Sequence, residues 1–214
     1  MGLDILNYGE VSLVPVRMRD AADLERLLLQ DRDWLEPWEA TDPSGYRRFD
    51  VRGSVRNLRA AARVNEVLPY VMWHGDTLVG QLNVSQIHYG ALASASIGYW
   101  VGRDFAGRGI TPTSVALVTD YCFTKRGLHR VEICICTDNQ PSLAVVRKLG
   151  FHYEGLRRNY IHINGRWRDH FAFSLTKEDV PEGLLNRWLS KNTPDDWAAI
   201  PERDLQIAQT RLKG

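Results

Sequence analysis

Residues 97–112 have the sequence IGYWVGRDFAGRGITP, and this stretch decides how the rest of the chain is interpreted. An apolar, aromatic run ends in a glycine-rich turn, and helical signals begin directly after the turn. Thr111 is predicted to cap the helix, and Pro112 suits its first position, where a missing N–H costs nothing. Gly127 is predicted to follow the last turn of the helix. The stretch therefore predicts a buried strand, a tight turn and a helix in immediate succession.

The turn has the composition of an anion site. Gly107 and Gly109 allow backbone N–H groups to turn toward a ligand, and the helix start adds free N–H groups and a positive dipole end. A phosphate or pyrophosphate is the expected guest, with Arg103 and Arg108 as candidate charged partners. The alternative is a tight strand-to-helix turn without a ligand. The glycine spacing excludes a P-loop and the dinucleotide-binding fingerprint.

Composition bounds the class of protein. The chain has 214 residues, of which 44% are hydrophobic and 25% charged, and its formal net charge is +1. We assign residues 1–192 to one globular domain and 193–214 to a C-terminal tail. The balanced charge argues against a nucleic-acid partner, and no apolar run is long enough to span a membrane. The three cysteines suit neither a disulfide framework nor a zinc site, so we expect no metal and a cytoplasmic location.

Alternation and helical spacing predict the remaining elements. Strands are expected at 11–16, 67–73, 78–87, 94–101, 130–136, 153–163 and 166–175. Helices are expected after Asp20, around 55–62, at 143–149, around 184–189 and at 202–212. The strands 94–101 and 130–136 are joined by a helix and are expected to run parallel. Asn164 and Gly165 predict a tight hairpin between the last two strands.

Several groups of residues resemble the GNAT superfamily of N-acetyltransferases, and in particular its ribosomal-protein-alanine N-acetyltransferase subfamily. The turn is similar to the acetyl-CoA pyrophosphate loop, Gln/Arg-x-x-Gly-x-Gly/Ala, at Gly107 and Gly109, whereas Asp104 departs from the first position. The other similar features are Leu35-x-Pro37-Trp38, Ile97 to Val101, Arg130-Val131-Glu132, Asn139-x-x-Ser142, Leu149-Gly150-Phe151 and Trp167 to His170. The resemblance covers about residues 8 to 180.

This resemblance implies a mixed α/β fold, with helices on both faces of a mostly antiparallel sheet that is splayed between the parallel strands 94–101 and 130–136. It also implies acetyl-CoA as co-substrate, with its pantetheine arm in the gap against the backbone of Tyr99, Trp100 and Val101. The pyrophosphate is then expected on Phe105, Ala106, Gly107, Arg108, Gly109, Ile110 and Thr111. Asn139 is expected to bind an amide of the pantetheine arm, to cap the following helix, or to do both.

The resemblance assigns Ser142 to the leaving thiolate. Many relatives place a tyrosine seven residues after the asparagine as the acid, and that position is Val146 here. Ser142 is therefore either the acid itself or a hydrogen-bond donor to the sulfur or to a water.

Glu132 is the candidate general base. Many relatives carry a glutamate at the position of Ser96, and Glu132 on the neighbouring strand is the best remaining carboxylate. The alternative is that Glu132 only forms a salt bridge with an arginine such as Arg130 or Arg168. Further candidates for the base are His88, Tyr160 and Asp169, of which Tyr160 and Asp169 are also assigned to acceptor binding. For Asp169 the alternative is that it orients other groups or holds the sheet.

The acceptor side is expected near Trp34 and Trp38. They flank Pro37 in a segment too apolar for a solvated loop, and form either a hydrophobic cluster or a lid over the acceptor cleft. We expect direct acetyl transfer to a primary amine, with the N-terminal α-amino group of a protein as the leading candidate. A small amine or an aminoglycoside is the alternative acceptor, and a non-catalytic acyl-CoA-binding module is the alternative class. A homodimer is left open.

Overall fold

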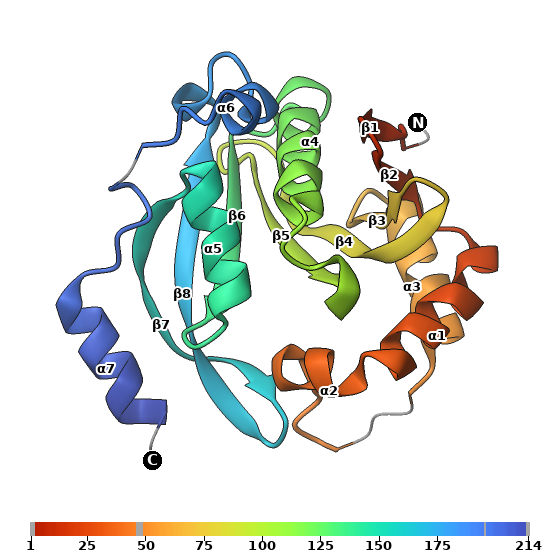
Figure 1. The fold of residues 1–214 in the computed structure, drawn as a ribbon, viewed down its shortest axis with the longest axis horizontal. Helices are drawn as coiled ribbons and strands as arrows, with labels where there is room; N and C mark the ends of the chain where they lie inside the picture. Colours follow the sequence, from red (N-terminus) through yellow and green to blue (C-terminus); the bar gives the residue numbers. More distant parts are fainter. Residues whose placement is uncertain (1–2, 46–48, 195, 213–214) are drawn as a thin grey trace.

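A single mixed sheet organises the protein (Figure 1). The computed structural model describes residues 3–45, 49–194 and 196–212, so residues 1–2 and 46–48 of the predicted domain and 195, 213 and 214 of the predicted tail lie outside it. Within the described residues the sheet has eight strands in the order β1-β2-β3-β4-β5-β6-β8-β7. The strands are β1 (Leu6–Tyr8), β2 (Val11–Pro15), β3 (Leu68–His74), β4 (Thr77–His88), β5 (Ser94–Val101), β6 (Arg130–Cys136), β7 (His152–Ile163) and β8 (Arg166–Thr176).

The parallel pair β5 and β6 lies inside an otherwise antiparallel sheet. These two strands are in register only from Ser94↔Arg130 to Ser96↔Glu132. Beyond that point they separate, and within the described residues 97–101 have no strand partner on the β6 side. The splay between two parallel strands, and with it the predicted fold class, is confirmed.

Helices cover both faces of the sheet. On one face lie α1 (Ala21–Gln30) and α3 (Val51–Arg63), and on the other lie α4 (Ile110–Thr124), α5 (Gln140–Leu149) and α6 (Leu184–Ser190). The smaller hydrophobic cluster joins α1 and α3 to residues such as Val71 and Leu78. The larger cluster joins α4, α5 and α6 to the opposite face. Burial of apolar side chains on both faces therefore stabilises the sheet as a middle layer.

The start of α4 differs from the prediction. The helix begins at Ile110, one residue before the predicted cap, and its N-cap is Gly109 in the left-handed conformation with φ 80°. Pro112 occupies the third helical position, which it tolerates because N–H groups of the first turn have no intrahelical acceptor. Gly127, with φ 67°, follows the helix end as predicted. Nearly all of α4 is buried, which explains why its apolar and small polar residues continue around the whole helix.

The β7–β8 turn agrees with the prediction, whereas one edge strand was not predicted. The β7–β8 hairpin turns at Asn164 (φ 46°) and Gly165 (φ 84°), as predicted, because both positions require a positive φ that this pair adopts readily. Strand β1 was not predicted, since three residues at a sheet edge carry too short an alternation to be recognised. The remaining elements are η1 (Met18–Asp20), α2 (Arg32–Leu35), η2 (Glu36–Trp38), η3 (Arg103–Phe105), η4 (Lys177–Asp179) and α7 (Glu202–Leu212).

The C-terminal elements pack on the sheet and on α4. The carboxylate of Asp120 accepts the backbone N–H groups of Leu184 (2.6 Å) and Leu185 (3.0 Å), which fixes the start of α6. Helix α7 lies beside β7, where Ala208 is buried and Asp204 accepts the hydroxyl of Tyr153 at 2.7 Å. In the part of the chain that the structure describes, no helix combines the length and apolarity needed to cross a membrane.

Candidate active site

The turn between β5 and α4 forms an open backbone cradle, which we call the anion loop (residues 105–111). Gly107 and Gly109 have φ values of 77° and 80°, a left-handed conformation that residues other than glycine rarely adopt. A Cβ atom added at Gly107 would meet no atom within 4 Å, so the space in front of the loop is free. Within the described residues no backbone acceptor is found for the N–H groups of 107–111. These donors and the dipole of a 15-residue helix point to one place, which suits a diphosphate.

Charges near the anion loop are divided between anchoring and free roles. Arg103 is bound to Asp33 at 2.5 Å, and its backbone N–H donates to Asp31 at 2.7 Å. The bond from Arg103 lowers the pKa of Asp33. Arg108 is exposed, has no ion-pair partner among the described residues, and lies 5.5 Å over the ring of Phe105. Arg103 therefore ties the loop to α2, whereas Arg108 is available to a ligand.

A large cavity of about 870 Å³ runs from the anion loop into the splay and on to α1, α2 and α3. It brings together most of the predicted site residues. These are Trp34, Trp38, Tyr99, Trp100, Val101, Ala106, Gly107, Gly109, Ile110, Thr111, Asn139 and Ser142. The predicted residues absent from its lining are Phe105, Arg108, Glu132, Tyr160 and Asp169, together with the further candidates Arg103 and His88.

Asn139 and Ser142 sit at the start of α5, on the wall of the cavity that faces β5. The side chain of Asn139 accepts the backbone N–H of Ser142 at 3.2 Å, so the predicted cap is present. Helix α5 begins at Gln140, three residues before the predicted start, which places Ser142 in its first turn. The hydroxyl of Ser142 lies 2.8 Å from the hydroxyl of Tyr99. Burial raises the pKa of Tyr99 well above its usual value, so this phenol stays protonated.

The tryptophan segment closes the other end of the cavity. The indole N–H of Trp34 donates to the carbonyl oxygen of Val101 at 3.1 Å. After Trp38 the chain meets the β7–β8 hairpin, where Ala40 forms a bridge with Ile163 and the N–H of Thr41 donates to the carbonyl oxygen of His162 at 2.8 Å. The segment after Trp38 and the hairpin tip therefore lie side by side, and Figure 1 shows α2 next to this hairpin.

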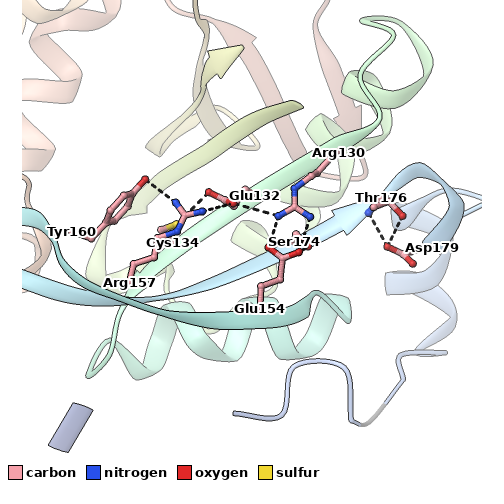
Figure 2. Close-up of polar contacts among 9 residues, drawn as sticks. All are labelled: Arg130, Glu132, Cys134, Glu154, Arg157, Tyr160, Ser174, Thr176 and Asp179. Atoms are coloured by element: carbon pink, nitrogen blue, oxygen red, sulfur yellow. Dashed lines mark hydrogen bonds and ion pairs between the residues drawn. The ribbon is translucent and has the colours of Figure 1, made fainter. Parts of the chain in front are cut away.

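Glu132 lies in an ion-pair network on the opposite face of the sheet from α5 (Figure 2). We define this network as Arg130, Glu132, Glu154, Arg157, Tyr160 and Ser174. Val131 and Ile133 pack in the cluster with α4, so the intervening Glu132 points to the other face.

The ion pairs of this network differ in part from the expected ones. Glu132 binds Arg157 at 2.6 Å and Arg130 at 3.4 Å. The predicted alternative partner Arg168 instead makes two bonds of 2.8 Å to Asp138, so its pairing with Glu132 was wrong. Arg157, in the middle of β7 where the strand register shifts, was missed because sequence spacing does not reveal cross-strand partners at a bulge.

Further contacts hold the members of the network and the adjacent Cys134 in place. The phenol of Tyr160 accepts a hydrogen bond of 2.9 Å from Arg157, whose guanidinium lies 4.9 Å from the tyrosine ring. Arg130 also binds Glu154 and lowers its pKa. The thiol of Cys134 lies 3.5 Å from Glu132, and burial raises its pKa to about 12, so it is a neutral donor there.

Asp169 lies away from the cavity, against the C-terminal helix. Its carboxylate accepts Arg211 Nε at 2.6 Å and the backbone N–H of Asn159 at 2.8 Å, and only 9% of the residue is exposed. These contacts fit the alternative in which Asp169 holds the sheet.

The cavity also contains residues that sequence reasoning missed. Lys148 lines it on the cavity face of α5, four residues after Ala144 and seven after Pro141, and this helical spacing was an available signal. Gln81 and Asn83 of β4 contribute amide groups from the face that carries Trp100. No motif marks them, because they reach the site only through strand pairing.

The residues fit CoA and offer no metal cage. Among residues 3–45, 49–194 and 196–212, no group of three His, Cys, Asp or Glu side chains is arranged to hold a metal ion. A backbone anion cradle that opens into a cavity at a splayed parallel pair suits a long thioester with a diphosphate. The fold and the site thus define the class of acyl-CoA-dependent acyltransferases.

Comparison with known proteins identifies the family. Residues 10–152 match the family described as Acetyltransferase (GNAT) domain, and the chain therefore belongs to this family. It is 31% identical over 168 residues to the probable N-acetyltransferase YjcK of Bacillus subtilis (strain 168), covering 77% of this chain and 93% of YjcK. It is 25% identical over 171 residues to the [ribosomal protein uS5]-alanine N-acetyltransferase of Escherichia coli (strain K12), covering 78% and 88%.

A solved structure agrees with this assignment. Mycobacterium smegmatis RimJ in complex with CoA-disulfide is 38% identical, covers 85% of this chain and 89% of that chain, and superposes with a TM-score of 0.78. The predicted superfamily membership is confirmed. The protein is an acetyl-CoA-dependent N-acetyltransferase.

Proposed function

We propose that the acceptor is the N-terminal α-amino group of a protein, as in the ribosomal-protein acetyltransferases among the relatives. The observation that carries this proposal is the aromatic end of the cavity. Trp34, Trp38 and Ala40 line it, and the bridge between Ala40 and Ile163 joins this end to the β7–β8 hairpin, which we take as the opening for the acceptor. Such an opening suits an extended chain end.

The charges of the cavity favour the same acceptor over a polyamine. Its lining contains two carboxylates, Glu39 and Asp50, and Glu39 is bound to Arg32, while most other lining residues are apolar or aromatic. A polycation would require several unpaired carboxylates for its charges. An α-amino group has a pKa of roughly 7.7–8.0, against about 10.4 for an alkyl amine such as lysine, so it loses its proton more easily near neutral pH.

The CoA moiety is proposed to bind along the wall of the anion loop and α5. The N–H groups of 107–111, with Arg108 and Lys148, hold the diphosphate, and the backbone of 99–101 lines the pantetheine arm. This follows from the free donors at the loop and from the open edge of β5 beyond Ser96.

The chemistry is a direct transfer. Acetyl-CoA supplies the acetyl thioester, and the neutral amine nitrogen attacks its carbonyl carbon. A C–N bond forms, the C–S bond breaks with its electron pair on sulfur, one amine proton leaves, and sulfur takes up one proton. Glu132 is proposed to receive the amine proton, directly or through water, because it lies opposite Ser96, the last residue of β5 that pairs with β6 before the strands separate.

An acceptor panel tests this proposal. The protein is incubated with acetyl-CoA and a hexapeptide that begins with alanine, the same peptide with a blocked N-terminus, or spermidine, and products are read by mass spectrometry. We expect acetylation of the free peptide alone. Acetylation of spermidine alone would reject the proposed acceptor. Thermal stabilisation by CoA with no thiol released for any amine would instead favour the non-catalytic alternative.

A variant links the result to the opening. Trp38→Ala is expected to raise the KM for the peptide at least several-fold, because the aromatic wall of the opening is lost. Leu189→Ala removes an exposed apolar side chain on α6 and is expected to leave KM unchanged. Equal effects of the two variants would contradict a role of Trp38 at the opening.

A further inference from the structure

The hydrogen bond between Tyr99 and Ser142 joins two elements that the sheet splay separates. Tyr99 comes from β5 and Ser142 from the first turn of α5, and their hydroxyl oxygens lie 2.8 Å apart. Both side chains line the cavity that begins at the anion loop. The contact is therefore part of the wall along which the thioester is proposed to lie.

This contact brings a phenol to the first turn of α5, whereas the position at which many relatives carry an acidic tyrosine is a valine in this chain. The residue seven positions after Asn139 is Val146, which is fully buried in the core under α5 and cannot act on a ligand. Tyr99 brings its phenol to the neighbouring position on the cavity side of the same helix. A phenol is more acidic than the aliphatic hydroxyl of serine, so between these two groups Tyr99 is the better donor and Ser142 the acceptor.

The position of Ser142 adds a second contribution. It occupies the third position of the ten-residue helix α5, where Asn139 holds its backbone N–H and fixes its place. The positive end of a helix dipole stabilises a nearby anion such as a thiolate. Tyr99 and Ser142 are neutral, and the charged side chains lining the cavity are Glu39, Asp50 and Lys148.

Ser142 is the expected donor of a proton to the leaving sulfur, and we propose that Tyr99 completes a hydrogen-bonded pair with it by positioning the Ser142 hydroxyl and returning the proton that it gives up. As the C–S bond breaks, the electron pair remains on sulfur and sulfur takes the proton of the Ser142 hydroxyl. Ser142 takes the proton of Tyr99, and the phenolate regains a proton from solvent. The proton lost by the amine balances the proton gained by the thiol.

This inference rests on the proposed position of CoA, and its first test needs no acceptor. The thiol of bound CoA is titrated by the ultraviolet absorbance of the thiolate, with desulfo-CoA, which lacks the sulfur, as the baseline. In the wild-type protein the pKa of the bound thiol is expected about one unit below that of free CoA, since hydrogen bonds to a charged group favour it. In Tyr99→Phe and Ser142→Ala it is expected to return toward the free value.

The control is Tyr70→Phe. Tyr70 is a buried tyrosine outside the cavity, and its hydroxyl has no hydrogen-bond partner among the described residues. This variant is expected to leave the thiol pKa unchanged, and thermal unfolding of all variants reports whether each is folded. Bound CoA with the same thiol pKa in Tyr99→Phe as in the wild type would overturn the pair alone. Failure of the wild type to bind CoA would overturn the proposed CoA site and the pair together.

Kinetics with acetyl-CoA and the alanine peptide provide a second measurement. Tyr99→Phe and Ser142→Ala are each expected to lower kcat about tenfold to 100-fold with little change in the KM for acetyl-CoA. The double variant is expected to lose no more than Ser142→Ala, because the two hydroxyls act as a unit. Additive losses in the double variant would show separate actions and overturn the pair.

Discussion

The anion loop and the ion-pair network each hold residues proposed to act in acetyl transfer, but the chain builds them in different ways. The loop is made of consecutive backbone N–H groups that Gly107, Gly109 and the start of α4 turn in one direction. The network is made of side chains from β6, β7 and β8, and Glu132 depends on Arg157, which is 25 residues away. A backbone site follows from local conformation, whereas a side-chain site follows from strand pairing.

This difference has a functional consequence. A backbone cradle offers the same N–H groups whatever side chains surround it, which suits a ligand part that does not vary, such as a diphosphate. A network of ion pairs can be altered one residue at a time. We therefore expect substitution of Glu132 in the network to change turnover and substitutions in the loop to change the binding of CoA.

The largest effect is expected for Glu132→Gln. Loss of the proposed base is expected to lower kcat by about 10²–10⁴-fold, the range of general-base catalysis, with little change in the affinity for acetyl-CoA. Steady-state kinetics and calorimetry measure the two quantities. The control is Glu154→Gln, which removes the other carboxylate bound to Arg130. An unchanged kcat in Glu132→Gln would remove Glu132 from the mechanism and leave it a structural ion pair.

The loop is tested by Gly109→Val. A β-branched residue at φ 80° is strained by about 1–3 kcal/mol, so the cradle is expected to deform and the Kd for CoA to rise about tenfold to 100-fold. Calorimetry measures the Kd. Gly75→Val carries similar strain at φ 56° in the β3–β4 turn and is the matched control. Equal CoA affinity in both variants would break the distinction drawn here.

A smaller effect is expected for Arg211→Ala, which separates Asp169 from the active site. The change leaves a nearly buried carboxylate with only the N–H of Asn159, and is expected to lower the free energy of unfolding by about 1–2 kcal/mol because Arg211 is partly exposed. Chemical denaturation measures this, and the exposed Arg203→Ala is the control. The kcat is expected to stay at the wild-type value. A large fall in kcat would contradict the purely structural role of Asp169.

The smallest effect concerns His170, beside the network. Burial lowers the pKa of His170, whose ring faces Arg168, Asp169, Asp138, Cys136 and Tyr160. The unfolded chain, with a histidine pKa of about 6.5, therefore binds more protons below that pH than the folded chain does. The contribution of neutral His170 to the free energy of unfolding is therefore present above pH 6.5. It is lost as the pH falls toward the pKa of the folded state, by at most about 1.4 kcal/mol per pH unit.

The measurement is the free energy of unfolding between pH 7.5 and pH 5.5. His170→Asn is expected to flatten its dependence on pH, and the exposed His88→Asn is expected to leave the slope unchanged. The slope decides the matter whatever the stability of each variant, and an equal slope in wild type and His170→Asn would contradict the assignment.

Sequence patterns predicted much of the fold because the relevant forces are local. Strands β5 and β6 were predicted with the bounds observed, since alternation and the flanking glycines mark them directly. The start of α4 lies two residues before the predicted one because Gly109, and not Thr111, takes the capping position, which a preference for threonine caps does not anticipate. The family resemblance, and not periodicity, predicted the splay after Ser96.

The side-chain arrangements were harder to predict for a physical reason. The partners of Glu132 depend on the bulges of β7, which move Arg157 into place and leave Arg168 with Asp138. Asp169 faces α7 because alternate residues of β8 point to opposite faces, and the docking of α7 has no signal near Asp169 itself. The phenol of Tyr99 reached Ser142 only through packing of α5 on the splayed strand.

The bridge from Ala40 to Ile163 and the bond from Thr41 to His162 join the segment after Trp38 to the β7–β8 hairpin through main-chain atoms. Main-chain contacts do not depend on the identity of the side chains, so substitutions on the outer surface of the hairpin leave this connection intact. Under the proposed function, substitutions of the side chains that line the cavity would change which acceptor is preferred, while the connection between the two segments is kept.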